Sequence, residues 1–179
     1  MALRMVALLR GINVGRAKRV SMAELAALLT ELGYTEVRTH LNSGNVVFSC
    51  QPRAKTGAAA KIRKAIADQL GIECEVMTRT AAELQAVVEG NPLADIATDP
   101  ARYLVAFLSD KPKPAAVRSV QAADYGDDEI RIVDDHAYLW CAQGVNDSPV
   151  VKAAWQRALG VSATTRNWRT VLKLAELAG

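Results

Sequence analysis

The residues of this 179-residue chain that are best suited to binding chemistry lie in a basic segment near the N-terminus. Residues 10–19, with the sequence RGINVGRAKR, combine four cationic side chains with two glycines. Glycine adopts positive φ angles and lets the backbone approach a ligand closely. The segment also leads into the start of a predicted helix, whose free amides favour anions. We therefore predict that this loop binds a phosphate or carboxylate through Arg10, Gly11, Asn13 and Gly15; the alternative is a surface loop with solvated cations.

A second group of polar residues lies in the tight-turn sequence NSGN at residues 42–45. In a ferredoxin-like unit the first and second strands point the same way, so this turn and the end of the first strand lie at the same edge of the sheet. Ser43 and Asn45 should then lie near Arg10 and Asn13, and together they offer a hydroxyl, two amides and a guanidinium. Turn chemistry alone also explains the sequence, because Gly and Asn tolerate left-handed conformations.

A third group, TTRNWRT at residues 164–170, lies where we predict the last helix to begin, near Thr165. Either threonine can cap that helix, and Arg166 places a cation near its positive end. This arrangement is unfavourable unless an anion or a carboxylate lies close by. We assign Trp168 to the core, because it shares a helical stripe with apolar residues.

Together these groups lead to one main hypothesis, an anionic small-molecule ligand such as a nucleotide or a phosphorylated metabolite. Arg10 and Arg166 would supply charge, and Gly11 and Gly15 would shape the loop. Four polar residues would orient the ligand, namely Asn13, Ser43, Asn45 and Asn167.

No recognisable catalytic constellation accompanies these groups, so the sequence leaves open whether the protein is an enzyme. It contains neither G-x-x-x-x-G-K-[ST] nor G-x-G-x-x-G nor G-x-S-x-G. The two histidines, His40 and His136, lie far apart in strand-like segments, and no His, Cys and acid cluster has metal-ligand spacing. We predict no metal site, and the sequence identifies no cofactor.

The charge is unevenly distributed, although 22 Lys and Arg against 19 Asp and Glu give a net charge of only +3. Residues 1–20 and 148–179 are basic, whereas residues 121–135 carry six acidic side chains. Two alternative functions follow: a nucleic-acid-binding module that uses the basic N- and C-terminal segments, or a protein-interaction module that uses the acidic stretch. RNA recognition through stacked aromatic residues is disfavoured, because the predicted central strands offer only Phe48.

Hydropathy and cysteine usage predict a cytoplasmic protein with no membrane partner. The longest apolar run at the N-terminus, residues 5–9, is too short for a signal peptide, and no window approaches a membrane span. The three cysteines form no C-x-x-C pair, which is typical of a reducing compartment. The sequence does not indicate an oligomeric state.

The elements that must position these groups follow from hydrophobic periodicity and capping signals. Ser21 and Glu24 form a capping box that begins a helix, and Gly33 ends it. Strands are expected at residues 3–9, 36–41, 45–50 and 72–77, and a second helix at 57–70. This is the split β-α-β order of a ferredoxin-like unit.

The same order partly recurs in the second half of the chain. Strands are expected at 103–108, 129–133 and 137–141, with helices at 114–123, from Ser148 and from Thr165 to Leu177. We predict an α+β fold of duplicated ferredoxin-like units with antiparallel sheets and an extra C-terminal helix. The predicted units are residues 1–78 and 101–179, joined by a helical connector at 79–100.

Three motifs, taken together, resemble a known family. Residues 8–15 (LLRGINVG), 41–48 (LNSGNVVF) and 164–171 (TTRNWRTV) resemble the bacterial domain-of-unknown-function family 1697, in order and over nearly the whole chain. One departure is Arg16, where the family commonly has a second glycine, so this loop is more cationic. The resemblance implies a duplicated α+β architecture, and it implies no established activity, substrate or cofactor.

Overall fold

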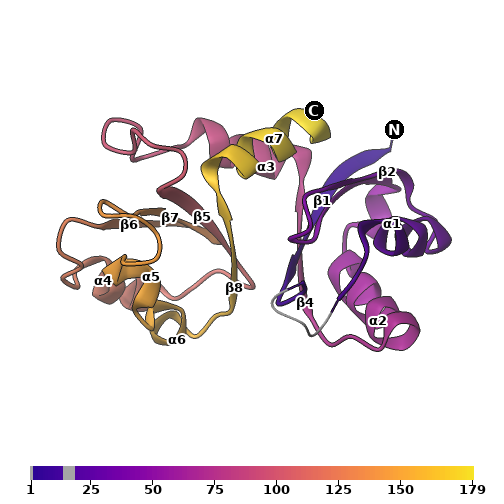
Figure 1. Cartoon of the computed structure of the whole chain (residues 1–179), viewed down its shortest axis with the longest axis horizontal. Coiled ribbons are helices and arrows are strands. Elements are labelled where there is room, and N and C mark those ends of the chain that lie inside the picture. The colour runs from indigo at the N-terminus through magenta and orange to yellow at the C-terminus, as the bar shows by residue number, and fades with distance from the viewer. Residues whose placement is uncertain (1, 14–18) are drawn as a thin grey trace. The chain divides into compact units, whose positions relative to one another are not determined.

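The computed structural model describes residues 2–13 and 19–179, and the chain divides into two compact units (Figure 1). Unit 1 comprises Met1–Ala86 and Leu174–Gly179, and unit 2 comprises Val87–Lys173. Each unit contains one four-stranded antiparallel sheet.

Unit 1 has the strand order β2-β3-β1-β4, which is the ferredoxin-like order. Its strands are β1 (Leu3–Arg10), β2 (Thr35–His40), β3 (Asn45–Cys50) and β4 (Glu75–Thr80). Helix α1 (Met22–Glu31) follows β1, and a 3-10 turn η1 (Pro52–Ala54) and helix α2 (Ala58–Leu70) connect β3 to β4. Helix α3 (Ala81–Glu89) follows directly and leads into unit 2.

The core of unit 1 lies between its sheet and the helices α1 and α2, which Figure 1 shows beside it. Alternate residues of β1 face this core, because side chains of a strand point to opposite faces in turn. These residues, Met5, Ala7 and Leu9, pack in one cluster with Leu25 of α1 and Ile62 of α2. The predicted Ser21–Glu24 capping box is present and begins α1.

Unit 2 repeats this arrangement with the strand order β6-β7-β5-β8. Its strands are β5 (Tyr103–Leu108), β6 (Glu129–Val133), β7 (His136–Trp140) and β8 (Ala163–Asn167). Its helices are α4 (Pro114–Gln121), α5 (Pro149–Lys152) and α6 (Trp155–Leu159). Helix α7 (Trp168–Ala178) follows β8, and its last residues belong to unit 1. The duplicated ferredoxin-like α+β fold predicted from the sequence is therefore confirmed.

The predicted start of the last helix, near Thr165, is wrong, because residues 163–167 form strand β8. The β-branched side chains of Thr164 and Thr165 favour a strand, and Thr165 pairs with Ala106 of β5. The helix begins at Trp168, and the Asn167 side chain performs the capping that we expected from a threonine.

Within residues 2–13 and 19–179, no helix has the length and apolar character needed to cross a lipid bilayer.

Candidate functional site

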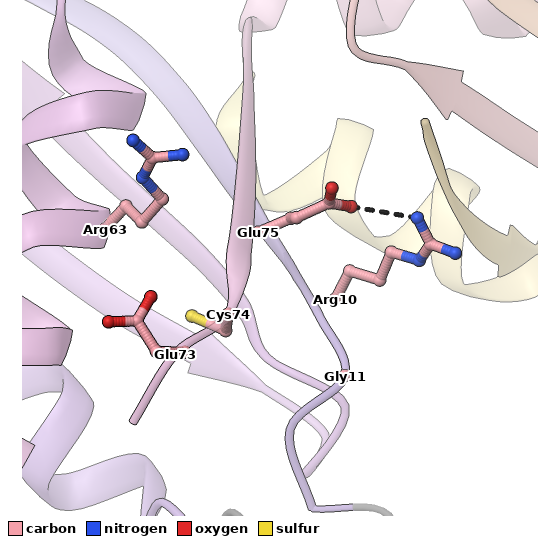
Figure 2. A pocket seen from close by; sticks show the side chains of 6 residues that line it. All are labelled: Arg10, Gly11, Arg63, Glu73, Cys74 and Glu75. Carbon is pink, nitrogen blue, oxygen red and sulfur yellow. Dashed lines mark hydrogen bonds and ion pairs between the residues drawn. The ribbon is translucent and has the colours of Figure 1, made fainter. Parts of the chain in front are cut away.

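A pocket of about 360 Å³ lies in unit 1 where β1 ends (Figure 2). Three segments line it: the end of β1 and the start of its loop, helix α2, and the start of β4. The antiparallel pairing of β1 with β4 places Arg10 opposite Glu75 and so brings the first and third segments together. The lining residues are Arg10, Gly11, Arg63, Glu73, Cys74 and Glu75.

The pocket lining contains two arginines and two glutamates, so its formal charges sum to zero. Arg10 Nη1 donates to Glu75 Oε2 over 2.9 Å, and these two side chains remain 44% and 47% exposed. Figure 2 shows Arg63 and Glu73 on the other side of the start of β4. Two guanidinium groups and two carboxylates can together bind a ligand that carries both an anionic group and hydrogen-bond donors.

Cys74 supplies the least polar part of the pocket wall. Cys74 is not part of a disulfide, and the residue is buried among the apolar residues of the unit 1 core. The pocket thus combines a charged rim with a buried, uncharged wall, as small-molecule sites commonly do.

Asn13 bonds to Val20 and to the β2–β3 turn through three hydrogen bonds. Its Nδ2 donates to the carbonyl oxygens of Val20, at 2.9 Å, and Asn42, at 2.8 Å. Its Oδ1 accepts a hydrogen bond from the Val20 amide at 2.9 Å. The side chain therefore connects the two ends of the loop to the β2–β3 turn, and the left-handed backbone of Asn13 (φ 55°) allows this geometry.

The β2–β3 turn lies next to the end of β1, as predicted, and its polar residues bond to one another. Asn45 is buried, and its Nδ2 donates to the His40 carbonyl at 2.8 Å and to Ser43 Oγ at 2.9 Å. The Leu9 amide donates to the Gly44 carbonyl at 2.8 Å. The structure therefore brings Asn13, Ser43 and Asn45 together around the turn, whereas the Arg10 guanidinium bonds to Glu75.

Arg166 and Asn167 lie in unit 2, at the end of β8. Arg166 is 8% exposed, and its Nη1 donates to Thr164 Oγ1 at 2.8 Å and to the Thr165 carbonyl at 2.9 Å. Burial lowers the pKa of Arg166 to about 10. Asn167 Oδ1 accepts from the Thr170 amide at 2.9 Å and so caps α7. Their participation in an anion site stays a prediction, and Gly15 lies outside the residues that the structure describes.

Arg166 belongs to a short repeat that was not predicted from the sequence. In unit 1, Arg79 near the end of β4 donates through Nη1 to the carbonyl of its preceding residue, Thr78, at 2.9 Å. Thr80 and Glu83 then cap α3, as Asn167 caps α7. The repeated Thr-Arg-[Thr/Asn] sequence at residues 78–80 and 165–167 carries this signal, and it identifies a structural strand-to-helix junction in both units.

Four pocket residues were also missed, namely Arg63, Glu73, Cys74 and Glu75. The predicted strand order gave a partial indication of their position, because a fourth strand antiparallel to the first must begin where the first ends, close to Arg10. In residues 2–13 and 19–179, no group of three His, Cys, Asp or Glu side chains is placed to hold a metal ion.

Comparison with known proteins gives a family and a fold. The family model described as "Protein of unknown function (DUF1697)" matches residues 3–138. No curated protein matches the chain. Among solved structures, the chain is similar to the conserved bacterial protein SP0830 from Streptococcus pneumoniae, with 23% identity, a TM-score of 0.77 and coverage of 100% of both chains. At this identity, the likeness extends to the fold alone.

Proposed function

The chain belongs to the DUF1697 family of proteins of unknown function, and we propose that its first unit binds a small phosphorylated molecule, such as a nucleotide or a sugar phosphate. The ligand would occupy the pocket at the end of β1. One observation carries the proposal: two arginines from separate elements, Arg10 of β1 and Arg63 of α2, are among the residues that line one pocket of about 360 Å³.

A phosphate group can compete with Glu75 for Arg10. Ion pairs between exposed side chains contribute only about 0.2–1 kcal/mol, and the Arg10–Glu75 pair is almost half exposed. A phosphate offers more acceptor oxygens and more charge than a carboxylate, and guanidinium groups bind it in a bidentate manner. The basic loop sequence that follows Arg10 adds positive charge that favours the approach of an anion.

The two carboxylates of the pocket favour phosphorylated ligands that also carry hydrogen-bond donors. Once Glu75 is released from Arg10, it and Glu73 can accept hydrogen bonds from sugar hydroxyls or from an exocyclic amine. Asn13, two residues after Gly11, makes three hydrogen bonds to Val20 and Asn42. We therefore assign it a positioning role for Gly11, whose backbone lines the pocket.

Isothermal titration calorimetry at low salt tests the proposal with AMP, ribose 5-phosphate and inorganic phosphate. We expect the organic phosphates to bind more tightly than inorganic phosphate, and Arg10→Ala and Arg63→Ala each to weaken them about tenfold or more, since a hydrogen bond between charged groups contributes about 1.5–3 kcal/mol.

The matched control is Arg118→Ala, which removes an exposed arginine from α4 in unit 2 and should leave binding unchanged. Absence of binding by all three compounds, or equal affinity of the wild type and both pocket variants, would show that the proposal is wrong.

A further inference from the structure

The connection between the third and fourth strands differs between the two units. In unit 1 it contains α2, a continuous helix of 13 residues. In unit 2 it contains α5, of 4 residues, and α6, of 5 residues. The backbone between them is extended at Ala153, with φ −69° and ψ 148°. Two short helices therefore replace one long helix beside the sheet of unit 2 (Figure 1).

A pocket of about 310 Å³ lies beside this interrupted connection. Leu104 of β5 and Leu139 of β7 contribute side chains from the sheet, and three further apolar residues come from the connection: Val145, Val151 and Trp155. Trp155 is 4% exposed, whereas Val151 is 39% exposed, so the pocket extends from the core of unit 2 to its surface.

The lining is apolar with two polar groups. Gln156 of α6 contributes a carboxamide and Thr165 of β8 contributes a hydroxyl, and none of the seven lining residues is charged. A charged ligand would lose its hydration there without gaining an ionic partner. An uncharged ligand with a single polar group would bury its apolar part and donate to, or accept from, one of these two side chains.

We propose that unit 2 binds an uncharged bicyclic aromatic molecule that carries one hydrogen-bonding group, in the class of indole or naphthol. Its size follows from the volume, because an apolar cavity of about 150 Å³ accommodates benzene and this pocket is about twice as large. Its aromatic character follows from Trp155, since aromatic rings gain energy from offset or edge-to-face contacts beyond the area that they bury.

This site is independent of the phosphate site proposed in unit 1. The two pockets have no lining residue in common, and they lie in different units. Arg10→Ala should therefore leave the affinity for the aromatic ligand unchanged. Either proposal can be disproved without affecting the other.

The experiment is a titration of the full chain with indole and 2-naphthol, followed by calorimetry and by amide NMR shifts. We expect binding with shifts concentrated at the lining residues of unit 2. Val151→Trp places a large side chain at the exposed mouth and should abolish binding. Thr165→Val removes the hydroxyl at constant shape and should weaken 2-naphthol about two- to tenfold.

Val133→Trp is the matched control, because Val133 is 40% exposed on β6 in the same unit and does not line the pocket. This variant should bind as the wild type does. The proposal is overturned if neither compound binds at millimolar concentration, if Val151→Trp binds normally while folded, or if 1-octanol binds as tightly as 2-naphthol.

Discussion

The two units share one strand order but present different surfaces to a ligand. Unit 1 covers its sheet with the continuous helix α2 and has a charged pocket at the strand ends, lined by Arg10, Arg63, Glu73 and Glu75. Unit 2 interrupts the corresponding helix and has an uncharged pocket beside Trp155. The comparison shows that the connection between the third and fourth strands can vary while the sheet stays the same.

The interrupted connection of unit 2 depends on a buried carboxylate. Asp128 accepts hydrogen bonds from the Ala142 amide at 2.8 Å, from Ser148 Oγ at 2.5 Å and from the Val150 amide at 3.2 Å. It thereby fixes the segment before α5 and the first turn of α5. In unit 1 the continuous helix is instead bounded by two glycines with left-handed backbone, Gly57 and Gly71.

Among the substitutions that test this comparison of the two units, Asp128→Ala should have the largest effect, because it removes the carboxylate that holds the interrupted connection of unit 2. It leaves three donors, two of them buried, without their acceptor, and we expect the free energy of unfolding to fall by about 3–4 kcal/mol, as urea denaturation would measure. Amide exchange should accelerate in α5 and α6 more than in α2. Asp147→Ala is the control, because that side chain is 83% exposed, and it should cost about 0.5 kcal/mol or less.

If Asp128→Ala and Asp147→Ala lowered the free energy of unfolding equally, that result would contradict the role that we assign to Asp128. So would a uniform loss of amide protection across both units, because that result would mean that the carboxylate stabilises the whole chain and not the interrupted connection.

Gly44→Ala tests the contact between the β2–β3 turn and the end of β1 in unit 1. Gly44 has φ +78°, and an added Cβ would lie 2.7 Å from Leu9 Cβ and 2.7 Å from Ile12 Cδ1. We expect a loss of about 2–4 kcal/mol in the free energy of unfolding, from the strained backbone and the clash together.

Gly33→Ala separates these two causes. Gly33 also has a positive φ, +87°, but no atom lies within 4 Å of its added Cβ. Its substitution should cost only about 1 kcal/mol. If both alanine variants lose the same stability in urea denaturation, the turn does not pack against β1 as tightly as the structure indicates.

Glu75→Gln examines the charge balance of the unit 1 pocket. The substitution keeps the shape of the side chain but removes the carboxylate that competes for Arg10, so inorganic phosphate should bind about two- to fivefold more tightly, consistent with the small energy of an exposed ion pair. Calorimetry measures the change, and Glu31→Gln, at the end of α1, is the control. Weaker binding by Glu75→Gln would show that Glu75 supports the phosphate site and does not oppose it.

Much of the fold could be predicted from the sequence because local signals agreed with the global arrangement. The capping boxes at Ser21 and Thr80 and the Ser148-Pro149 sequence all begin helices in the structure. The boundary near Thr165 was wrong because cap-forming threonines are also β-branched, and the pairing with β5 decided between these two preferences.

The sites were harder to predict, since they depend on register and on tertiary packing. The loop that starts at Arg10 was identified from its charge and its glycines, but the pairing of Arg10 with Glu75 requires the β1–β4 register, which a single sequence does not contain. The break between α5 and α6 falls at Ala153 and Ala154, which are strong helix formers, so local propensity gives no sign of it.

The smallest predicted effect concerns the edge of unit 1 where the C-terminal segment returns to it. Arg4 Nη2 donates to the Leu177 carbonyl at 2.8 Å, and Arg4 also faces Glu36, to which Ser49 Oγ donates at 2.6 Å. The Ser49 hydrogen bond, and then the charge of Arg4, lower the pKa of Glu36 below its ordinary value of 4.5. A carboxyl group whose pKa is lowered on folding stabilises the protein above its unfolded pKa, and this contribution is lost as pH falls through the folded pKa.

Ser49→Ala should therefore raise the pKa of Glu36 toward 4.5. The part of the free energy of unfolding that is lost as the pH falls should become smaller. An NMR titration of the side-chain carboxyl carbons measures the shift. Glu24 is an internal control in the same spectra, because the Ser21 hydroxyl lowers its pKa independently, and its titration should not move. If Glu36 still titrates well below 4.5 in the variant, the Arg4 charge is the larger cause, and the edge of unit 1 is held mainly by the arginine that also binds the C-terminal segment.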